Sequence, residues 1–199
     1  NNASGDDSFI GGGNGNTSGG SQSTVSGGSS NEALGVHSTV SGGFTNRATV
    51  DFATVGGGDT NLASGQHSTV SGGDNNTASG SHATVSGGDG NVANALWSTV
   101  SGGLQNSSSN NRATIGGGEL NNASAVYSTI SGGRENTASS SYSTVSGGQD
   151  NTASTNTHAT VGGGNSNTAS GAQSSVVGGN ANNASGDDSF IGGGNGNTS

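Results

Sequence analysis

Apolar residues recur at a single position of a short repeat that runs along the whole chain. Each repeat begins with asparagine, at residues 1, 16, 31, 46, 61, 76, 91, 106, 121, 136, 151, 167, 182 and 197, so the step in the numbering is 15 and once 16. With that Asn as position 1, position 3 is Ala or Ser, position 8 is Ser or Ala, position 10 is Val or Ile, and positions 12 and 13 are Gly. A register held this strictly predicts an ordered repeat protein rather than a disordered chain.

Positions 8 to 11 of each repeat read as a strand, as in Ser23–Ser26, Ser38–Ser41 and Ala83–Ser86. Side chains alternate along a strand, so positions 8 and 10 share one face and positions 9 and 11 the other. Positions 1 to 4 make a second short strand, and a repeat this short has no room for a helical pair. The sequence therefore predicts an all-β, parallel β-solenoid of 15-residue coils, with about 13 coils in a single continuous solenoid over residues 1–199.

Glycine is expected at the corners of each coil, because it adopts positive φ angles at no steric cost. The candidates are the Gly-Gly pair and the glycines at position 5, which are Gly5, Gly20, Gly35, Gly65, Gly80, Gly171 and Gly186. The one longer step, at 154–158, predicts an outward bulge at a corner.

The recurring asparagines, here called the Asn column, are predicted to face inward and stack. An Asn amide held in register can hydrogen-bond to its copies in the coils above and below and to corner backbone groups. The structural ladder comprises Asn16, Asn31, Asn46, Asn61, Asn76, Asn91, Asn106, Asn121, Asn136, Asn151, Asn167 and Asn182.

Composition limits what such a coil can bury. Only 25% of residues are hydrophobic and 4% aromatic, and Cys, Pro and Met are absent, so disulfides cannot support so small a core. We therefore predict self-association, through the Thr column at position 9, where small side chains leave a flat face. The Thr column is Thr24, Thr39, Thr54, Thr69, Thr84, Thr99, Thr114, Thr129, Thr144 and Thr160.

Charge and motifs exclude several functions. The net charge is −9, from 12 acidic residues against three Arg and no Lys, which argues against nucleic acid as a partner. No apolar run approaches the ~20 residues that cross a bilayer, so no membrane insertion is expected in this segment. Because no nucleophile–base pair, phosphate loop or carboxylate dyad occurs at any one place, we predict a protein that is not an enzyme.

Planar side chains gather at position 7. We call this series the ring column, and it consists of Phe52, His67, His82, Trp97, Arg112, Tyr127, Tyr142 and His158. Two interpretations stay open: a strip that stacks on sugars or adheres to a surface, and a self-stacked ladder that stabilises one corner. Arg112 lies in a position for cation–π contact with its neighbours in the column.

Three consecutive coils carry aspartate at position 14, just after Gly-Gly. This Asp column is Asp59, Asp74 and Asp89. Like charges one strand spacing apart repel, and bound Ca²⁺ would relieve the repulsion with oxygen ligands. Other coils carry Asn14, Phe44 or Leu104 there, so a calcium site in every coil is excluded and solvated acidic corners are the alternative. No other cofactor is expected.

The units Ser-Thr-Val-Ser-Gly-Gly and Asn-Thr-Ala-Ser-Gly, as at 68–73 and 76–80, resemble the head repeats of trimeric autotransporter adhesins, the YadA-like family. The resemblance implies a left-handed parallel β-roll, a trimer, a cell-surface or extracellular location and binding to collagen or other host matrix. The family's repeat is slightly shorter than the repeat of this chain. No neck, stalk or membrane anchor is recognisable in the sequence, so the transporter part of the family is unsupported.

The segment 1–18 recurs without change as 182–199, displaced by 181 in the numbering. This super-repeat predicts that the chain is a window of a longer fibre joined end to end. We therefore expect a non-enzymatic extracellular filament or adhesive surface appendage whose main partner is itself, with host matrix, surface or glycan as further partners. Two alternatives stay open: an ice-binding solenoid that uses the Thr column, and a glycan-binding adhesin that uses the ring column.

Overall fold

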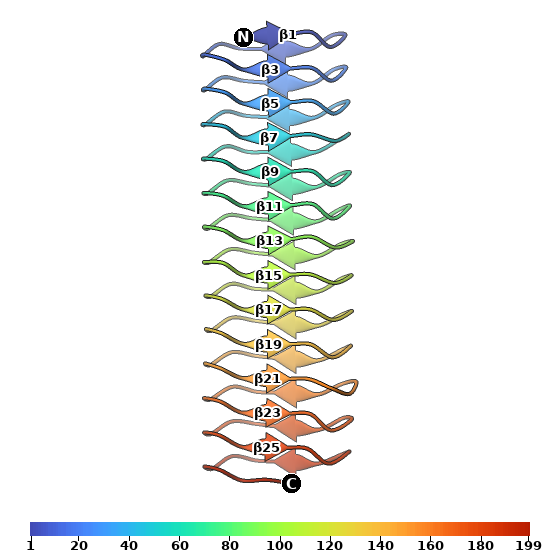
Figure 1. The fold of residues 1–199 in the computed structure, drawn as a ribbon, viewed down its shortest axis with the longest axis vertical. Helices are drawn as coiled ribbons and strands as arrows, with labels where there is room; N and C mark the ends of the chain where they lie inside the picture. The colour runs from blue at the N-terminus through green and yellow to red at the C-terminus, as the bar shows by residue number, and fades with distance from the viewer. The chain divides into compact units, whose positions relative to one another are not determined.

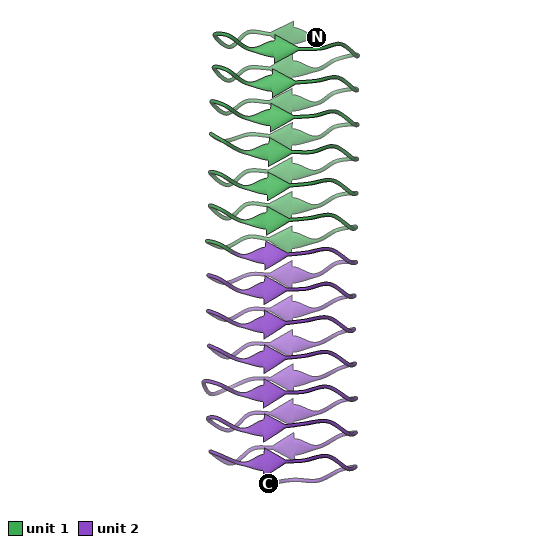
Figure 2. Ribbon diagram, turned by 180° about the vertical axis from the view of Figure 1, so that it is seen from behind, with its two compact units in different colours: residues 1–97 green, residues 98–199 purple.

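The computed structural model describes residues 1–199, and its regular secondary structure consists of β-strands alone. It divides into two compact units, unit 1 (Asn1–Trp97) and unit 2 (Ser98–Ser199), which are described separately (Figure 2). Each coil contributes two strands of two residues, one to each of two parallel sheets (Figure 1). The predicted all-β, parallel β-solenoid of about 13 coils is thereby confirmed. No helix long and apolar enough to cross a membrane is present.

In unit 1, every strand pairs in parallel with the equivalent strand of the next coil. One sheet holds β1 (Asn2–Ala3), β3 (Thr17–Ser18), β5 (Glu32–Ala33), β7 (Arg47–Ala48), β9 (Leu62–Ala63), β11 (Thr77–Ala78) and β13 (Val92–Ala93). The other holds β2 (Phe9–Ile10), β4 (Thr24–Val25), β6 (Thr39–Val40), β8 (Thr54–Val55), β10 (Thr69–Val70) and β12 (Thr84–Val85).

Unit 2 repeats this arrangement. Its first sheet holds β15 (Ser107–Ser108), β17 (Asn122–Ala123), β19 (Thr137–Ala138), β21 (Thr152–Ala153), β23 (Thr168–Ala169) and β25 (Asn183–Ala184). Its second sheet holds β14 (Thr99–Val100), β16 (Thr114–Ile115), β18 (Thr129–Ile130), β20 (Thr144–Val145), β22 (Thr160–Val161), β24 (Ser175–Val176) and β26 (Phe190–Ile191).

The register follows the repeat frame, because like residues pair with like. Thr69 lies opposite Thr84, and Val70 lies opposite Val85. Backbone hydrogen bonds join the coils: the Ser71 N–H donates to the Val85 carbonyl at 3.0 Å. At the longer step Thr144 still pairs with Thr160, so the extra residue forms a corner bulge and leaves the strands in register, as the sequence predicts.

The interior of each unit is narrow and made of small residues. The position 10 side chains Val25, Val70, Ile115 and Val161 have no exposed surface, and neither do Ala or Ser at position 3 in the inner coils. Ser18 and Ser23 satisfy each other inside unit 1 through an Oγ–Oγ hydrogen bond of 2.7 Å. Because the two strands of a coil face each other across so little apolar volume, polar contacts at the corners matter as much as the core.

Two expectations about local structure were wrong. Strands cover two residues per segment rather than the four of Ser23–Ser26, because the chain turns away on either side of Thr24–Val25. The position 5 glycines do not have positive φ. Glycine serves there because the next coil passes close by: a Cβ on Gly65 would lie 2.0 Å from the Gly80 carbonyl oxygen.

Candidate functional site

Each coil has two corners, and its two turns project on opposite sides of the strands in both units (Figure 1). We call the turn over positions 11 to 15 the glycine corner and the turn over positions 5 to 8 the ring corner. Position 1, the Asn column, closes the glycine corner from inside, and position 7 lies at the tip of the ring corner. The two corners differ in burial, in backbone geometry and in sequence variation.

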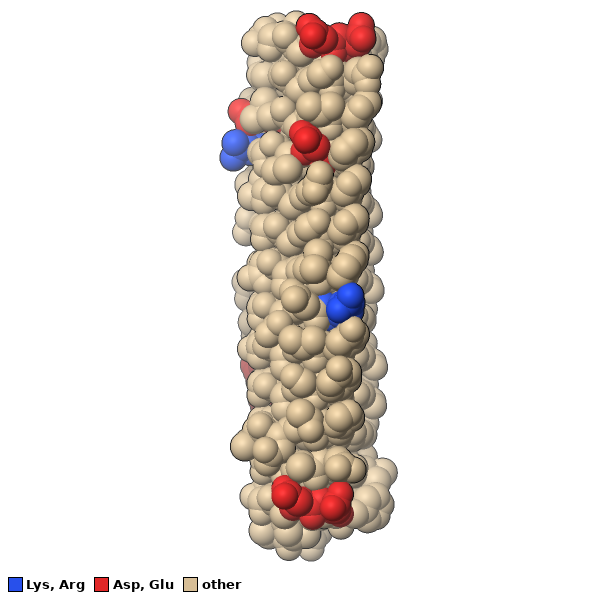
Figure 3. Space-filling view, turned by 90° about the vertical axis from the view of Figure 1, so that its right-hand side faces the viewer, with Lys and Arg blue, Asp and Glu red and all other residues tan.

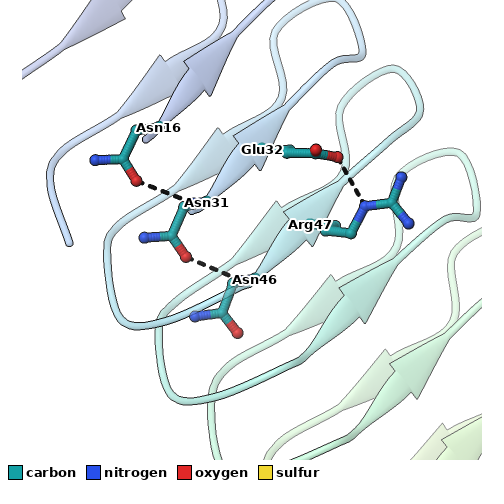
Figure 4. A network of polar contacts seen from close by, with 5 residues as sticks. All are labelled: Asn16, Asn31, Glu32, Asn46 and Arg47. Atoms are coloured by element: carbon teal, nitrogen blue, oxygen red, sulfur yellow. Dashed lines mark hydrogen bonds and ion pairs between the residues drawn. The ribbon is translucent and has the colours of Figure 1, made fainter. Parts of the chain in front are cut away.

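The Asn column is buried and fully hydrogen-bonded. The Asn76 Nδ2 group donates to the carbonyl oxygens of Gly72 at 3.0 Å and Gly88 at 2.8 Å. Its Oδ1 accepts from the Asn91 backbone N–H at 2.9 Å. The same chain of contacts joins Asn16, Asn31 and Asn46 (Figure 4).

All twelve predicted members of the Asn column, from Asn16 to Asn182, are at most 1% exposed. Each links one coil to the coils on either side within its unit, so the geometry is that of a structural seam with no access for a ligand.

Backbone geometry explains the glycines of this corner. Gly73 has a φ of 92°, and a Cβ there would lie 2.2 Å from the Gly88 carbonyl oxygen. Its neighbour Gly72 has open space around it, since the nearest atom to a Cβ, the Gly57 carbonyl oxygen, lies 3.8 Å away. Position 15 also has positive φ in residues other than Gly, for example 54° at Asn75, which sequence reasoning missed.

The ring corner is a tight turn with a strained tip. The Ala83 N–H donates to the Gly80 carbonyl at 3.1 Å, which closes the turn around His82. His82 has a φ of 58°, and every member of the ring column has a φ between 56° and 64°. Turns of this kind favour Gly or Asn at their third residue, and a left-handed backbone costs other residues about 1–2 kcal/mol. Bulky planar residues are therefore placed here against the local backbone preference.

The rings of unit 1 stack face to face along the coils. Ring centroids lie 4.6 Å apart for Phe52 and His67, 4.9 Å for His67 and His82, and 5.7 Å for His82 and Trp97. His37 extends the stack by one coil, 5.1 Å from Phe52, although the sequence analysis began the column at Phe52. His37 stands at position 7 of its coil, and this position is the signal in the sequence that would have placed it in the ring column.

Unit 2 holds a second, shorter stack. The Arg112 guanidinium lies over the Tyr127 ring, 5.2 Å from its centroid, as expected for a cation–π contact. Tyr127 and Tyr142 stack at 5.0 Å, and so do Tyr142 and His158.

Stacking leaves the rings exposed at their edges. Phe52 and Trp97 are each 44% exposed and Tyr142 is 50% exposed. Phe52, His67, His82 and Tyr142 each have a stacked neighbour on both faces, so they present a ring edge rather than a face to a partner. Ring edges carry partial positive charge, and those of His, Trp and Tyr also carry N–H or O–H groups, so most members of the ring column present a hydrogen-bond donor at their edge.

The Asp column lies on the exposed side of the glycine corner. Asp59 pairs in register with Asp74, and Asp74 with Asp89, so the three aspartates stand one per coil. The Thr60 hydroxyl donates to the Asp59 carboxylate at 2.7 Å. No group of three or more His, Cys, Asp or Glu side chains is close enough together to hold a metal ion. Calcium binding at the Asp column stays a prediction.

The Thr column lies on the outer face of the second sheet, half-buried between neighbouring side chains. In unit 1 it runs without interruption from Thr24 to Thr84, and Phe9 precedes it in the same register. In unit 2 it runs from Thr99 to Thr160 and is followed by Ser175 and the 66% exposed Phe190.

Fixed charges are few and exposed, and they form small separate groups on the face drawn in Figure 3. Arg47 and Glu32, which are paired across β5 and β7, form an ion pair of 2.8 Å (Figure 4). In unit 2 a hydrogen bond from Arg134 lowers the pKa of the Glu135 carboxyl, and Glu135 in turn raises the pKa of Arg134. Such surface pairs contribute little to stability.

Comparison with known families locates the shared part of the repeat. Residues 38–49 and 68–80 match the family model of the ubiquitous surface protein adhesin repeat. This match and the parallel solenoid fit the resemblance to YadA-like adhesin heads. Both matched segments run from position 8 through the glycine corner to position 4 or 5, so neither includes a member of the ring column. A search of curated proteins finds no significant match.

Proposed function

We propose that the chain is a non-enzymatic, adhesin-like surface solenoid that displays the ring column. The observation that carries this proposal is that the two corners of the coil differ in which residues they hold and how exposed those residues are. The family-like segment builds the glycine corner and its buried Asn column, whereas the planar residues occupy the exposed tip of the ring corner, where the backbone geometry disfavours them. Strained backbone positions cluster at functional sites, which supports a role for these side chains. The adhesin repeat also supports a location at the cell surface.

Self-association through the Thr column is the second part of the proposal. The column is flat and regular, and its β-branched residues pack well against another such face. The narrow core supports it as well, since small scaffolds without disulfides gain stability by oligomerising. The likeness to trimeric adhesin heads favours three chains, and the super-repeat favours assembly into a longer fibre.

Attachment of chain-coated beads to immobilised collagen tests the adhesive role. The ring variant F52Q/H67Q/H82Q keeps the turn, because Gln22 and Gln173 already occupy position 7 with a φ of 57°. The control variant L62T/V92T changes the outer face of the first sheet in the same unit and uses a residue that is common at position 2. We expect the ring variant to reduce attachment about tenfold and the control to leave it unchanged. Equal attachment by both variants would contradict the adhesive role of the ring column.

A glycan-binding surface is the second candidate, supported by the row of donor-bearing ring edges. Contact would use edges and hydrogen bonds, since neighbouring rings cover the faces that sugars stack on. Beads applied to a polysaccharide-coated surface beside the collagen surface separate the two candidates. Attachment to polysaccharide alone, lost in the ring variant, would favour the glycan.

Ice binding through the Thr column requires that this column remain exposed. Light scattering of the intact chain decides whether it does: a folded monomer that shows thermal hysteresis would favour ice binding, and an oligomer that dissociates on T69K/T84K would favour self-association.

A further inference from the structure

We propose that copies of this chain associate side by side in register, with the ring corner of one copy against the glycine corner of the next. This contact is distinct from the Thr column and does not depend on adhesion. The proposed partner is a second copy of this chain. The reason is that the side chains at position 7, on one exposed tip of a coil, complement those at position 14, on the opposite tip.

In unit 1 the two tips are complementary in charge in the coils that carry His67 and His82, although Asp59 shares its coil with Phe52. His67 shares a coil with Asp74, and His82 shares a coil with Asp89. Protonated imidazole and carboxylate attract each other across such a contact. Earlier in the series, His37 shares a coil with Phe44, which is 54% exposed and offers a ring to a ring.

Unit 2 carries the same complementarity with different residues. Arg112 shares a coil with Glu119, an opposite-charge pair, and Tyr127 shares a coil with Arg134, a pair suited to cation–π contact. Where position 7 is acidic, at Asp7 and Asp188, position 14 is Asn14 or Asn195. No coil carries a carboxylate at both position 7 and position 14. When two copies align coil for coil, the contact therefore contains no pair of like charges.

Spacing makes the pairs act together. The backbone at position 14 forms parallel β-bridges from coil to coil, as between Asp59, Asp74 and Asp89. The side chains at position 7 climb by the same coil spacing, with ring centroids 4.6 and 4.9 Å apart. Two copies of a unit with parallel axes therefore bring the pairs of that unit into contact together, and many weak contacts add up when they are linked. Because the two tips are different surfaces, the contact is heterologous and continues into an array unless a rotation closes it.

The charges make the contact depend on pH. An imidazole gains its proton between pH 8 and 5, while aspartate stays ionised. Within the ring column, His67 and His82 stack on each other, and Phe52 and Trp97 cover their outer faces. The nearby charged group is Asp51 at position 6. Its carboxylate accepts a hydrogen bond from the Val36 N–H. A protonated imidazole at the ring corner would face the Asp column of the next copy, so we expect the contact to strengthen at mildly acidic pH.

Sedimentation of the full chain at about pH 5.5 and about pH 8 tests this inference, with H67Q/H82Q and D74N/D89N as variants. Both substitutions have precedents in the chain, because Gln22 and Gln173 occupy position 7 and Asn14 and Asn165 occupy position 14. We expect the average mass of the unmodified chain to rise at the lower pH and to fall back in high salt. In each double variant the average mass should no longer rise at the lower pH. In an equimolar mixture of the two variants the average mass should rise again, because the intact ring corner of D74N/D89N can pair with the intact glycine corner of H67Q/H82Q.

The variants also separate pairing from general loss of charge near the isoelectric point. D74N/D89N is less acidic than the unmodified chain, so charge neutralisation alone would increase its association, whereas specific pairing decreases it. Association of D74N/D89N equal to or above that of the unmodified chain, or a mixture that shows no recovery, would overturn the proposal. Loss of the adhesive role of the ring column would leave this result unaffected.

Discussion

The two corners of the coil turn the chain with different kinds of residue. The glycine corner uses Gly where the next coil passes close by and seals the turn with a buried amide, as in Gly73 and Asn76, although its position 15 carries residues other than Gly at positive φ. The ring corner places His, Phe, Trp and Tyr where Gly or Asn would be easier, and leaves them half-exposed. The buried frame of the first corner is constant along the chain and matches a known adhesin repeat, whereas the tip of the second varies from coil to coil. The comparison teaches that the buried seam and the variable exposed tip are separate parts of a single coil.

The largest effect is expected from Asn76→Ala. The substitution removes the amide donor from the Gly72 carbonyl and the amide acceptor from the Asn91 N–H, whereas the Gly88 carbonyl keeps the Asp74 N–H as its donor. At about 1–3 kcal/mol for each of these two groups, the free energy of unfolding should fall by about 2–6 kcal/mol. Chemical denaturation measures it. Thr77→Ala, on the outer face next to it, should change the value by less than about 0.5 kcal/mol.

Gly73→Ala comes next. Its Cβ would collide with the Gly88 carbonyl, and Ala would be forced to a φ of 92°. Strain and overpacking together should cost about 2–5 kcal/mol. The adjacent Gly72→Ala is the matched control, with open space for its Cβ, and thermal unfolding of the pair gives the comparison. Equal loss in both variants would show that the close approach of the coils is not what selects glycine.

His82→Asn should have a small net effect. The stacks on His67 and Trp97 are lost, at about 0.5–1.5 kcal/mol, while Asn relieves about 1–2 kcal/mol of left-handed strain. We expect the free energy of unfolding to change by less than about 1 kcal/mol. His82→Ala is the control, since it loses the stacks without relieving the strain and should be the less stable of the two. A large loss in His82→Asn would mean that the rings hold the solenoid together.

The smallest effect concerns the Arg134–Glu135 pair. Arg134 lowers the pKa of Glu135 in the folded chain, so the pair favours folding above the unfolded-state pKa and ceases to do so as pH falls through the lowered folded-state pKa. Because both groups are exposed, Arg134→Gln should leave the pH dependence of unfolding nearly unchanged. Unfolding curves recorded from neutral to acidic pH check this.

The repeating frame was enough to predict the coil, the parallel register and the burial of position 10. Val70 and its equivalents are the only large aliphatic residues that recur in strict register, so they define the interior. The site was harder to predict. Positive φ lies at His82 and Asn75 rather than at the position 5 glycines, because backbone torsion depends on how the turn closes and residue type is a weak guide to it.

Ring stacking was predicted as one of two open interpretations, and its detail required coordinates. Whether neighbouring planar groups meet by face or by edge depends on side-chain torsions that the sequence does not contain. Handedness and the number of chains stay predictions, because they depend on contacts beyond a single coil. The sequence contains the residues at positions 7 and 14, but their proposed contact between copies could be inferred only after the structure had placed both positions at exposed tips of the coil.

The most direct test of the account compares the two corners of one coil in the same two assays. Asn76→Ala and His82→Asn both lie in the coil that begins at Asn76. We predict that Asn76→Ala lowers the unfolding midpoint and, below that midpoint, leaves bead attachment to collagen intact, whereas His82→Asn nearly keeps the midpoint and weakens attachment. A large drop in the unfolding midpoint of His82→Asn, or attachment that is unchanged in that variant, would contradict the separation of stability from adhesion.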